Sequence, residues 1–354
     1  MKCTDENKDT FKPTGNIIVK SLGLSVMFFS ILFLTGISCE NEVDQIEMIS
    51  LENVMMIDGS SDPCNIFTPI DISLDGNGNI FILDPITMTI LKFSSAGEFL
   101  NSFGGIGEAP WEFGRTGFNF DIDNTGRVYV IDLPNIVKVF SNDGEFLNNI
   151  NVDLGRVFDV AVLDSSRIFV SGHPNVLLLS ETTDNPAAFR INTNGEVLNE
   201  YGSLHAEVED LGLKIMLFDC AIDVDQDNSL YFTSVGEYKV QKYSSSGDLI
   251  WETDGPMEFE PYTISYGEDG SELVPVVMDL DYEDNRVFVL WAQGVTDNGY
   301  RVDVFDSDDG NLEGYFYTLV PSQARNWSIE INANHFFVVD YENAFIHRYD
   351  MIFQ

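Results

Sequence analysis

Short apolar runs, in which hydrophobic and polar residues alternate with a period of two, recur along most of the chain. This alternation is typical of β-strands that bury one face. Turns rich in Gly, Asp and Ser separate the runs, for example Asp75-Gly-Asn-Gly78 and Ser94-Ser-Ala-Gly97. Glycine tolerates the positive φ that tight turns between antiparallel strands require. The pattern therefore predicts an all-β protein of many short antiparallel strands.

The runs are organised in a unit that recurs six times along the chain. Each unit has an apolar strand, a turn, a strong apolar strand that often ends in Asp, a third strand, a second turn and a fourth strand. The first strands of the units are expected at 70–74, 118–122, 158–162, 218–224, 277–281 and 327–331. Four strands per unit at a spacing of about 40 to 60 residues is typical of a β-propeller.

The sixth unit ends after its third strand, because the sequence stops at Gln354. Residues 46–57 precede the first unit, have strand character, and are expected to supply the missing fourth strand. Closure has a physical reason, since an open propeller would expose unpaired strand edges. The predicted fold is a six-bladed β-propeller of four-stranded antiparallel blades, closed by an N-terminal strand that completes the last blade.

Two motifs carry a resemblance to a known repeat. Gly104-Gly-Ile-Gly-Glu-Ala-Pro-Trp-Glu-Phe113, followed by Asp121–Asp132, resembles an NHL repeat with its preceding Gly-rich loop. Asp132-Leu-Pro-Asn135 and Asp340-Tyr-Glu-Asn343 match the Asp-x-x-Asn turn of that family. From about residue 46 to 354 the chain resembles the TolB-like, six-bladed propeller lipoproteins of Bacteroidetes. The resemblance is specific for the fold and does not specify an activity.

The first residues are typical of an export signal. A Lys-bearing stretch ends at Lys20, an apolar run covers 22–34, and small residues lead to Cys39. A short apolar run with such flanks indicates a secretory signal rather than a membrane span. The segment around Cys39 resembles a lipobox, although Gly36 stands where the motif usually has Leu. We expect a signal peptide at 1–38, a lipidated tether at 39–45 and the propeller at 46–354.

This N-terminus predicts an exported protein that is lipid-anchored in the outer membrane. An uncleaved N-terminal anchor is the alternative, and both arrangements place the propeller outside the cytoplasm. Acidic residues directly after Cys39 (Glu40, Glu42 and Asp44) resemble the surface-export signal of Bacteroides-like lipoproteins. Which side of the outer membrane the protein faces stays open.

The expected mature part is strongly acidic. The whole chain has 18 basic and 58 acidic residues; residues 1–38 hold four Lys and three acids, which leaves 14 and 55, or about −41. Such a charge repels nucleic acid and anionic lipid head groups. We therefore expect no nucleic-acid partner, contact with the membrane only through the lipid anchor, and a monomeric propeller. A solvated surface for a salty habitat and an acidic binding surface both explain the charge.

The two faces of the predicted propeller differ in their loops. Loops after the first and third strands are short, whereas the loops after the second and fourth strands contain every long insertion, at 104–117, 172–188, 202–216, 252–275, 292–300 and 320–326. Long loops on a rigid scaffold usually carry function. Aromatic side chains there suit a partner protein or a glycan, or else pack between blades. The candidate ligand-binding residues are Trp111, Trp251, Tyr262, Tyr266 and Trp327.

Catalytic motifs are weak in this sequence. The four histidines do not fall at metal-ligand spacing, and no nucleophile elbow or P-loop is present. The resemblance includes propellers that are calcium-dependent lactonases or zinc lyases with carboxylates in the central channel. Acidic residues recur near the starts of the innermost strands here, at Asp71, Asp121, Asp159, Asp219 and Asp279. They could surround a cation or satisfy backbone donors at blade junctions.

Two functions therefore remain. The first, which we favour, is a non-catalytic binding or assembly module of the cell envelope that contacts a partner protein or a glycan through its long loops and needs no cofactor. The second is a hydrolase or lyase that depends on calcium or zinc at the central channel. The sequence also predicts that Cys64 and Cys220 stay unpaired, because they fall in opposite blades, beyond the roughly 7 Å that a disulfide spans.

Overall fold

A computed structural model describes residues 47–59, 66–114, 119–174, 186–202, 220–234, 237–256, 264–267, 270–273, 276–291, 298–320, 328–341 and 343–353. The chain divides into two compact units, Met1–Asp44 and Gln45–Gln354, and every described residue belongs to the second. The predicted signal peptide and Cys39 thus lie outside the described residues. Within the described part, no helix has the length and apolar character needed to cross a membrane.

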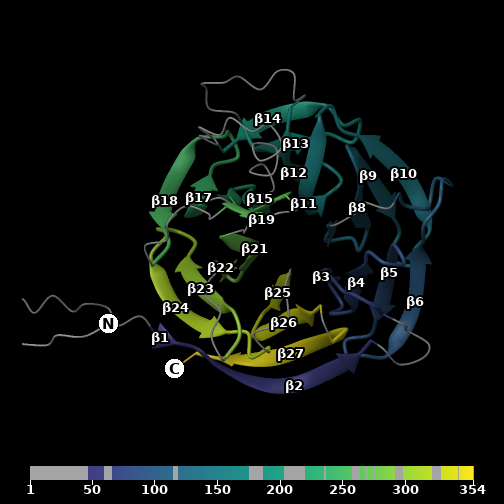
Figure 1. Cartoon of the computed structure of the whole chain (residues 1–354). Helices are drawn as coiled ribbons and strands as arrows, with labels where there is room; N and C mark the ends of the chain where they lie inside the picture. Colours follow the sequence, from purple (N-terminus) through teal and green to yellow (C-terminus); the bar gives the residue numbers. More distant parts are fainter. Residues whose placement is uncertain are drawn as a thin grey trace, which may run out of the picture. The chain divides into compact units, whose positions relative to one another are not determined.

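The second unit is all-β and forms the six-bladed propeller that the sequence predicts (Figure 1). Blade 1 contains β3 (Asp71–Leu74), β4 (Ile80–Asp84), β5 (Thr89–Phe93) and β6 (Phe99–Gly104). Blade 2 contains β7 (Phe120–Ile122), β8 (Val128–Asp132), β9 (Ile136–Phe140) and β10 (Phe146–Asn151). Blade 3 contains β11 (Arg156–Asp164), β12 (Arg167–His173), β13 (Ala188–Ile191) and β14 (Val197–Tyr201).

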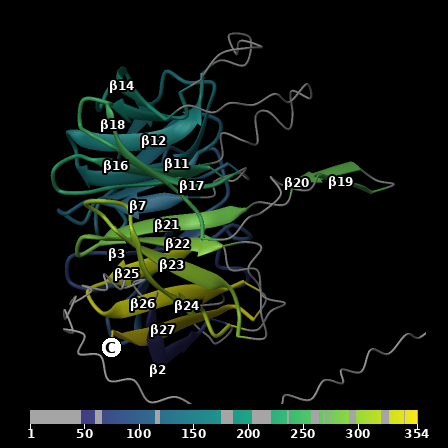
Figure 2. The same ribbon diagram turned by 90° about the vertical axis from the view of Figure 1, so that its left-hand side faces the viewer.

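The remaining blades follow the same order. Blade 4 contains β15 (Cys220–Val224), β16 (Leu230–Ser234), β17 (Glu237–Tyr243) and β18 (Leu249–Asp254). Blade 5 contains β21 (Val277–Glu283), β22 (Arg286–Trp291), β23 (Arg301–Asp306) and β24 (Leu312–Tyr317). Blade 6 contains β25 (Ile329–Asn332), β26 (His335–Asp340), β27 (Phe345–Ile352) and β2 (Ser50–Asp58). Between blades 4 and 5 in the sequence, β19 (Ile264–Gly267) and β20 (Gly270–Leu273) form a separate hairpin (Figure 2).

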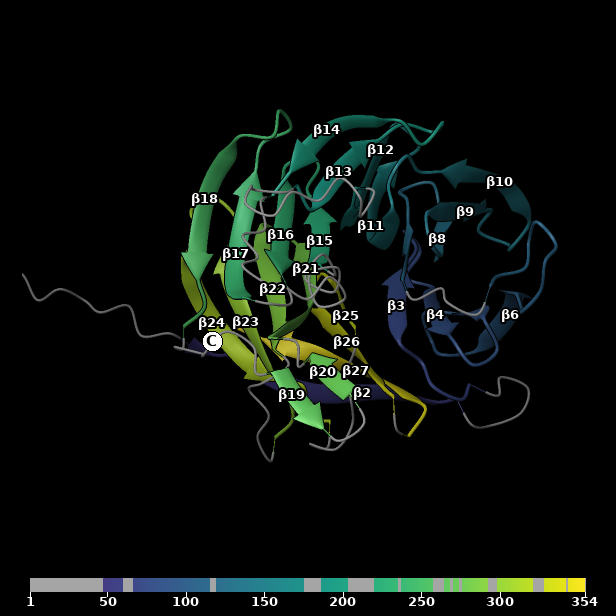
Figure 3. The same cartoon turned by 45° about the horizontal axis from the view of Figure 1, so that its top comes forward.

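The N-terminal segment closes the ring, as predicted, by pairing antiparallel with the last strand of the chain (Figure 3). Strand β2 faces β27 along its length, from Ser50 opposite Ile352 to Asp58 opposite Phe345. The predicted single strand at 46–57 is nevertheless two strands. The first, β1 (Glu47–Met48), pairs in parallel with β24 and adds a fifth strand to blade 5. The chain changes blade at Ile49, which is buried in the apolar core between blades 5 and 6.

The core consists of apolar clusters that lie between neighbouring blades. In blades 1 and 2 the second and third strands are almost wholly buried, whereas the fourth strands are mostly half-buried or exposed. One cluster, for example, joins Tyr129 and Val139 of blade 2 to Val162 and Ile168 of blade 3. Packing between blades therefore buries the apolar faces that period-two alternation predicts.

The innermost strands surround the central channel and differ in places from their predicted bounds. Strand β11 begins two residues earlier than expected, at Arg156, and β15 begins only at Cys220. The turns after the first and third strands are short, as predicted, and their leading Asp, Asn or Ser side chain accepts backbone N–H groups, as Asp75 does from Asn77 and Asn79. Such capped turns need no long loop to join adjacent strands.

Candidate functional site

Carboxylates on the innermost strands join each blade to the next at the central channel. Asp71 of blade 1 accepts the backbone N–H of Phe120 in blade 2 at 2.7 Å, and Asp121 of blade 2 accepts that of Val162 in blade 3 at 2.6 Å. Asp159 of blade 3 then accepts the N–H of Ile222 in blade 4 at 3.0 Å. Since each acceptor lies in one blade and each donor in the next, these bonds hold the blades together near the axis.

The series continues around the ring without a break. Asp223 of blade 4 accepts the N–H of Tyr282 at 2.7 Å, and Asp279 of blade 5 accepts that of Ile329 at 2.7 Å. Asp281 makes a second bond from blade 5, to the N–H of Ile331. Glu330 of blade 6 closes the circle by accepting the N–H of Leu74 in blade 1 at 3.2 Å. Every one of the six blade junctions therefore has at least one such hydrogen bond between blades, which we call a carboxylate tie.

Most of these carboxylates use their second oxygen within their own strand. The Oδ1 atoms of Asp71, Asp121, Asp159, Asp223 and Asp279 each accept the N–H of the following residue. Asp159 Oδ1 also accepts the side-chain amide of Asn119 at 2.9 Å. These carboxylates are therefore largely saturated by donors that belong to the blades themselves, which is how a buried polar group avoids its desolvation penalty.

The tie residues come from all six blades and affect one another electrostatically. Burial, together with the smaller effect of the neighbouring Asp159 charge, raises the pKa of Asp71 to about 7. Burial likewise raises the pKa of Asp159 to about 6 and that of Asp223 to about 7. The pKa values of Asp121, Asp279, Asp281 and Glu330 are also raised, first by burial and then by other channel carboxylates. The ring therefore favours protonated carboxyls at acidic pH.

The channel carboxylates do not fit a calcium or zinc site. Calcium needs six to eight oxygen ligands that converge on one point, whereas the oxygens here converge on backbone N–H groups of the neighbouring blade. Among the described residues, no three His, Cys, Asp or Glu side chains are arranged so that they could hold a metal ion. Of the candidate residues, Asp71, Asp121, Asp159 and Asp279 make ties, and Asp219 lies outside the described residues.

Sequence reasoning missed three of the tie residues: Asp223, Asp281 and Glu330. The recurring Asp near the start of each innermost strand drew attention to Asp219 in blade 4. Strand β15 instead begins at Cys220, and the tie is made by Asp223, later in the strand. The period-two alternation of Ala221-Ile-Asp-Val224 contains the signal, since it places Ile222 and Val224 on one face and Asp223 on the other.

A second feature is an apolar surface on the long-loop face of blade 1. Phe67, Ile86, Ile106 and Trp111 are 55%, 57%, 43% and 52% exposed, respectively. They lie in three loops that follow second or fourth strands: 66–70 after β2, 85–88 after β4, and 105–114 after β6. We call these four side chains the blade 1 patch. Half-exposed apolar side chains gathered in one place are typical of an interaction surface.

Hydrogen bonds hold the three loops of the patch side by side. The Asp84 carboxylate accepts the N–H of Phe67 at 2.6 Å and the N–H of Ile86 at 2.8 Å, so one side chain fixes two loops. The N–H of Gly105 donates to the carbonyl of Met88 at 2.6 Å and joins the third loop to the second. The patch is thus built on fixed backbone, which reduces the entropy lost on binding.

The loop that carries Trp111 also rests on a buried lysine. Lys138 Nζ lies 3.0 Å from Asp132 Oδ2, donates to the carbonyl of Glu112, and stands 5.5 Å from the centre of the Phe113 ring. The other Asp132 oxygen accepts the N–H of Gly114 at 2.9 Å. Phe113 is fully buried beneath the loop, and Trp111 remains at the surface.

The other candidate ligand-binding residues are placed differently. Trp251 lies in β18, is half-buried, and donates from Nε1 to the carbonyl of Ser307 in blade 5 at 3.0 Å. This is a packing contact between blades 4 and 5 near the short turns, so Trp251 does not belong to the long-loop face. Tyr266 falls within β19, and Tyr262 and Trp327 lie outside the described residues. Trp111 and Trp251 are the two of the five whose side chains are described, and of these Trp111 lies on the long-loop face.

Comparison with known proteins agrees with the fold. Residues 41–175 match the model of a family described as a 6-bladed beta-propeller, DUF5128, over rather more than a third of the chain. No curated protein sequence matches the chain. A DUF4221 family member from Bacteroides vulgatus has a TM-score of 0.57 at 11% identity, covering 87% of this chain and 99% of the other.

Two further solved structures show how widely this fold is used. A Bacteroides fragilis protein described as exported has a TM-score of 0.55 at 11% identity, covering 88% of this chain and 96% of the other. Virginiamycin B lyase from Staphylococcus aureus has a TM-score of 0.52 at 11% identity, covering 86% and 100%. At such identities the likeness shows the fold alone, and both an exported protein and an enzyme share it.

Proposed function

We propose that the protein is a non-catalytic binding module of the cell envelope, exported and anchored by lipid at Cys39, which engages a partner protein through the blade 1 patch. The observation that carries the proposal is the gathering of Phe67, Ile86, Ile106 and Trp111 on fixed loops of one face. Aliphatic side chains beside a Trp favour a protein over a glycan, because sugars stack mainly on aromatic rings.

The channel supports the same proposal. In a metal-dependent hydrolase of this shape, carboxylates would be available to ligands at the axis. Here the carboxylates tie the blades together, from Asp71 in blade 1 to Glu330 in blade 6. That arrangement favours the loops of the long-loop face as the binding surface.

The proposed anchor would keep the propeller near the membrane. Strand β1 begins at Glu47, eight residues after Cys39. Eight extended residues reach at most about 28 Å. The support for the anchor is the sequence around Cys39 together with the likeness to a protein described as exported. A short tether suits a module that binds another envelope component.

Site-specific photocrosslinking tests the proposed binding face in the full-length protein, expressed in cells of its source. A crosslinking amino acid at Ile86 should give a discrete adduct, because Ile86 is exposed in the loop that is hydrogen-bonded to the other two loops of the patch. The matched control is Leu249, which is 51% exposed on the outermost strand of blade 4 and should not give that adduct. The variant Ile106→Asp should abolish the Ile86 adduct, because it places a charge among the apolar contacts.

The nature of the adduct decides the partner class. A protease-sensitive adduct that depends on an intact patch supports the proposal. An adduct that yields to glycosidase and resists protease would replace the protein partner with a glycan. The same adduct from Ile86 and Leu249, or none from Ile86, would contradict the proposed binding face.

A further inference from the structure

Four of the six blades have a basic residue at the same position of the third strand, and blades 2 and 5 do not. In each blade an aromatic residue of the second strand stands directly opposite a residue of the third strand. The opposite residue is basic in four blades and valine in two. The pairs, in blade order, are Phe81–Lys92, Tyr129–Val139, Phe169–Arg190, Tyr231–Lys242, Phe288–Val304 and Phe337–Arg348.

The two lysines at this position fill the space between their own blade and the next. Lys92 Nζ and Lys242 Nζ each stand 5.2 Å from the centre of the ring opposite. Lys92 donates to the carbonyl of Asn142 at 3.0 Å, and Lys242 donates to that of Ser307 at 2.9 Å. Asn142 and Ser307 are both the second residue in the turn between the third and fourth strands of the next blade. Each ammonium is therefore held between an aromatic face and a turn carbonyl.

Blade 2 keeps the surroundings of this ammonium but has Val139 at the lysine position. The Tyr129 hydroxyl donates to Asp123 Oδ2 at 3.1 Å, just as the Tyr231 hydroxyl in blade 4 donates to Asp225 Oδ2 at 3.2 Å. In blade 4 that carboxylate oxygen lies 3.8 Å from the lysine ammonium. The aromatic ring and the buried carboxylate are thus present in blade 2, where a valine takes the place of the lysine and the Arg127 guanidinium interacts with the Tyr129 hydroxyl.

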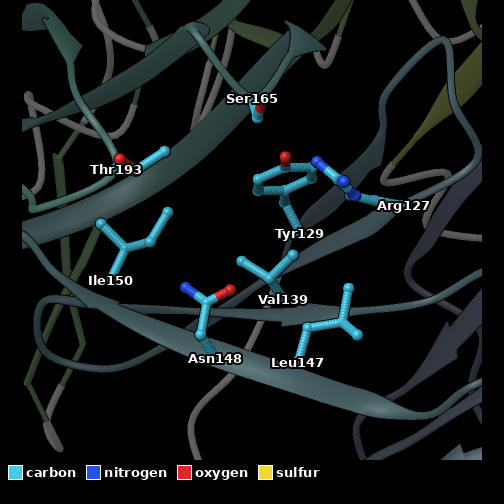
Figure 4. Close-up of a pocket in the computed structure, with 8 residues that line it drawn as sticks. All are labelled: Arg127, Tyr129, Val139, Leu147, Asn148, Ile150, Ser165 and Thr193. Atoms are coloured by element: carbon cyan, nitrogen blue, oxygen red, sulfur yellow. The ribbon is translucent and has the colours of Figure 1, made fainter.

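A cavity of about 390 Å³ opens at this junction on the short-turn face (Figure 4). Val139 and Ile150 of blade 2 lie at its apolar side, and Thr193 of blade 3 lies across from them. Thr193 is the second residue of its turn, so it corresponds to Asn142 and Ser307. The volume falls within the range of small-molecule sites, at its lower end.

Asn148 is a further polar group at the cavity. It stands opposite Val139 in the strand ladder, as Asn101 stands opposite Lys92 and Trp251 opposite Lys242. Asn101 and Trp251 donate across their junctions to turn carbonyls of the next blade, at 3.0 Å in each case. Asn148 instead lines the cavity, where its side chain is available to a ligand.

The other valine, Val304 of blade 5, lies at a junction that is packed with apolar side chains. Val304 is fully buried in a cluster with Ile49, the residue at which the N-terminal segment crosses from blade 5 to blade 6. The space at that junction is therefore filled from the same chain. Blade 2 has no corresponding inserted segment among the described residues, which explains why its valine leaves a cavity.

We propose that the blade 2–3 cavity binds a primary ammonium group on a short alkyl chain, placed where the side chains of Lys92 and Lys242 lie at their junctions. The Tyr129 ring, the Asp123 carboxylate and the turn carbonyl of Thr193 correspond to the ring, carboxylate and turn carbonyl that surround the Lys242 ammonium in blade 4. The formal charge of −40 on the chain draws cations to the surface. A free alkylamine and a lysine of another protein share this chemistry. The inference does not depend on the proposed function, which concerns the opposite face.

Arg127 gives the proposal a sharp test. Its side chain lies exposed at the cavity rim and points toward the Tyr129 hydroxyl (Figure 4). A guanidinium there opposes a second cation and would attract an anion. The variant Arg127→Gln should therefore tighten ammonium binding, by about threefold at low ionic strength. An anionic ligand would show the reverse effect.

The experiment is ligand-observed NMR with n-butylammonium, a close copy of a lysine side chain, titrated against the full-length protein at constant ionic strength. We expect saturable binding with a dissociation constant on the order of 1 mM, and no saturable binding of butyrate. Parallel titration with Nα-acetyl-lysine methylamide distinguishes the two sources. Preference for the blocked lysine indicates a lysine of a partner protein, and preference for butylammonium indicates a free amine.

Two variants that exchange the valine and lysine of this position between blades serve as controls within the same protein. Val139→Lys fills the cavity with the residue that the repeat uses elsewhere, so it should fold and should abolish binding. Adding Lys92→Val to that variant should restore one site, now at the blade 1–2 junction. Saturable binding that survives Val139→Lys, tighter binding of butyrate than of butylammonium, or weaker butylammonium binding in Arg127→Gln would each overturn the proposal. Arg127→Gln is a surface change, so the test does not depend on how the Lys92 variant folds.

Discussion

The carboxylate ring should make the propeller less stable as the pH rises from 5 to 8. Asp71 has a folded pKa of about 7 and an ordinary value of 3.8, so between these values the folded chain binds a proton that the unfolded chain has released. A state that binds more protons is favoured at low pH, and stability therefore falls as the pH rises through this window. Asp159 and Asp223, with pKa values of about 6 and about 7, act in the same direction.

The size of the effect follows from the shift at a single residue. At about 1.4 kcal/mol per pKa unit, the change from pH 5 to pH 8 removes about 2.5 kcal/mol of unfolding free energy through Asp71 alone. The contributions of the ring carboxylates are not simply additive, because ionising one of them raises the pKa values of the others. Asp164 acts in the opposite sense: the Ser166 hydroxyl and then Arg167 lower its pKa to about 2, so its effect is confined to pH below about 4.

Urea unfolding followed by tryptophan fluorescence, at pH 5, 6, 7 and 8 and constant ionic strength, measures this dependence. The variant Asp71→Asn keeps an acceptor oxygen for Phe120 but cannot ionise. Between pH 5 and 8 it should therefore lose about 2.5 kcal/mol less unfolding free energy than the wild type. The control Asp308→Asn removes a charge from an exposed turn and should parallel the wild type. A flat wild-type profile, or parallel profiles for wild type and Asp71→Asn, would refute the reasoning.

Three further predictions concern the closure of the ring and the cysteines. Glu330→Ala leaves the N–H of Leu74 without its acceptor and should lower the unfolding free energy, measured in urea, by about 1 to 3 kcal/mol. Glu330→Gln should retain most of the stability, and equal losses in the two variants would argue against the tie. A chain that starts after β2 should aggregate on size-exclusion chromatography, because the edge of β27 is left unpaired, and a monomeric product would contradict closure by β2. Thiol labelling of the denatured, unreduced mature chain should modify both Cys64 and Cys220, and protection of both would indicate a disulfide.

Much of the fold could be predicted from the sequence, because period-two alternation and Gly-containing turns are local signals. The six innermost strands were expected close to where they lie, and the N-terminal strand was expected to complete blade 6. The split into β1 and β2 was not expected. It depends on Ile49 fitting between two blades, which is a contact between segments far apart in the sequence. A single apolar run carries no signal for such a change of partner.

The site was less predictable for the same physical reason. The recurring Asp71, Asp121, Asp159 and Asp279 were recognised, with blade ties as one of two interpretations, and the structure shows the ties. Asp223 was missed, because its role depends on which residue of blade 5 lies beside it. The cavity beside Val139 becomes visible only when the ladder register shows that Lys92 and Lys242 occupy the same position in other blades.

Metal analysis of the purified full-length protein tests the central claim most directly: the channel carboxylates tie the blades and do not hold a catalytic ion. After exchange into metal-free buffer, elemental analysis by mass spectrometry should find calcium and zinc far below one equivalent per chain. The wild type and Asp159→Asn should give the same result. One tightly bound calcium or zinc ion per chain, lost in Asp159→Asn, would contradict the account and would favour the metal-dependent enzyme as the function.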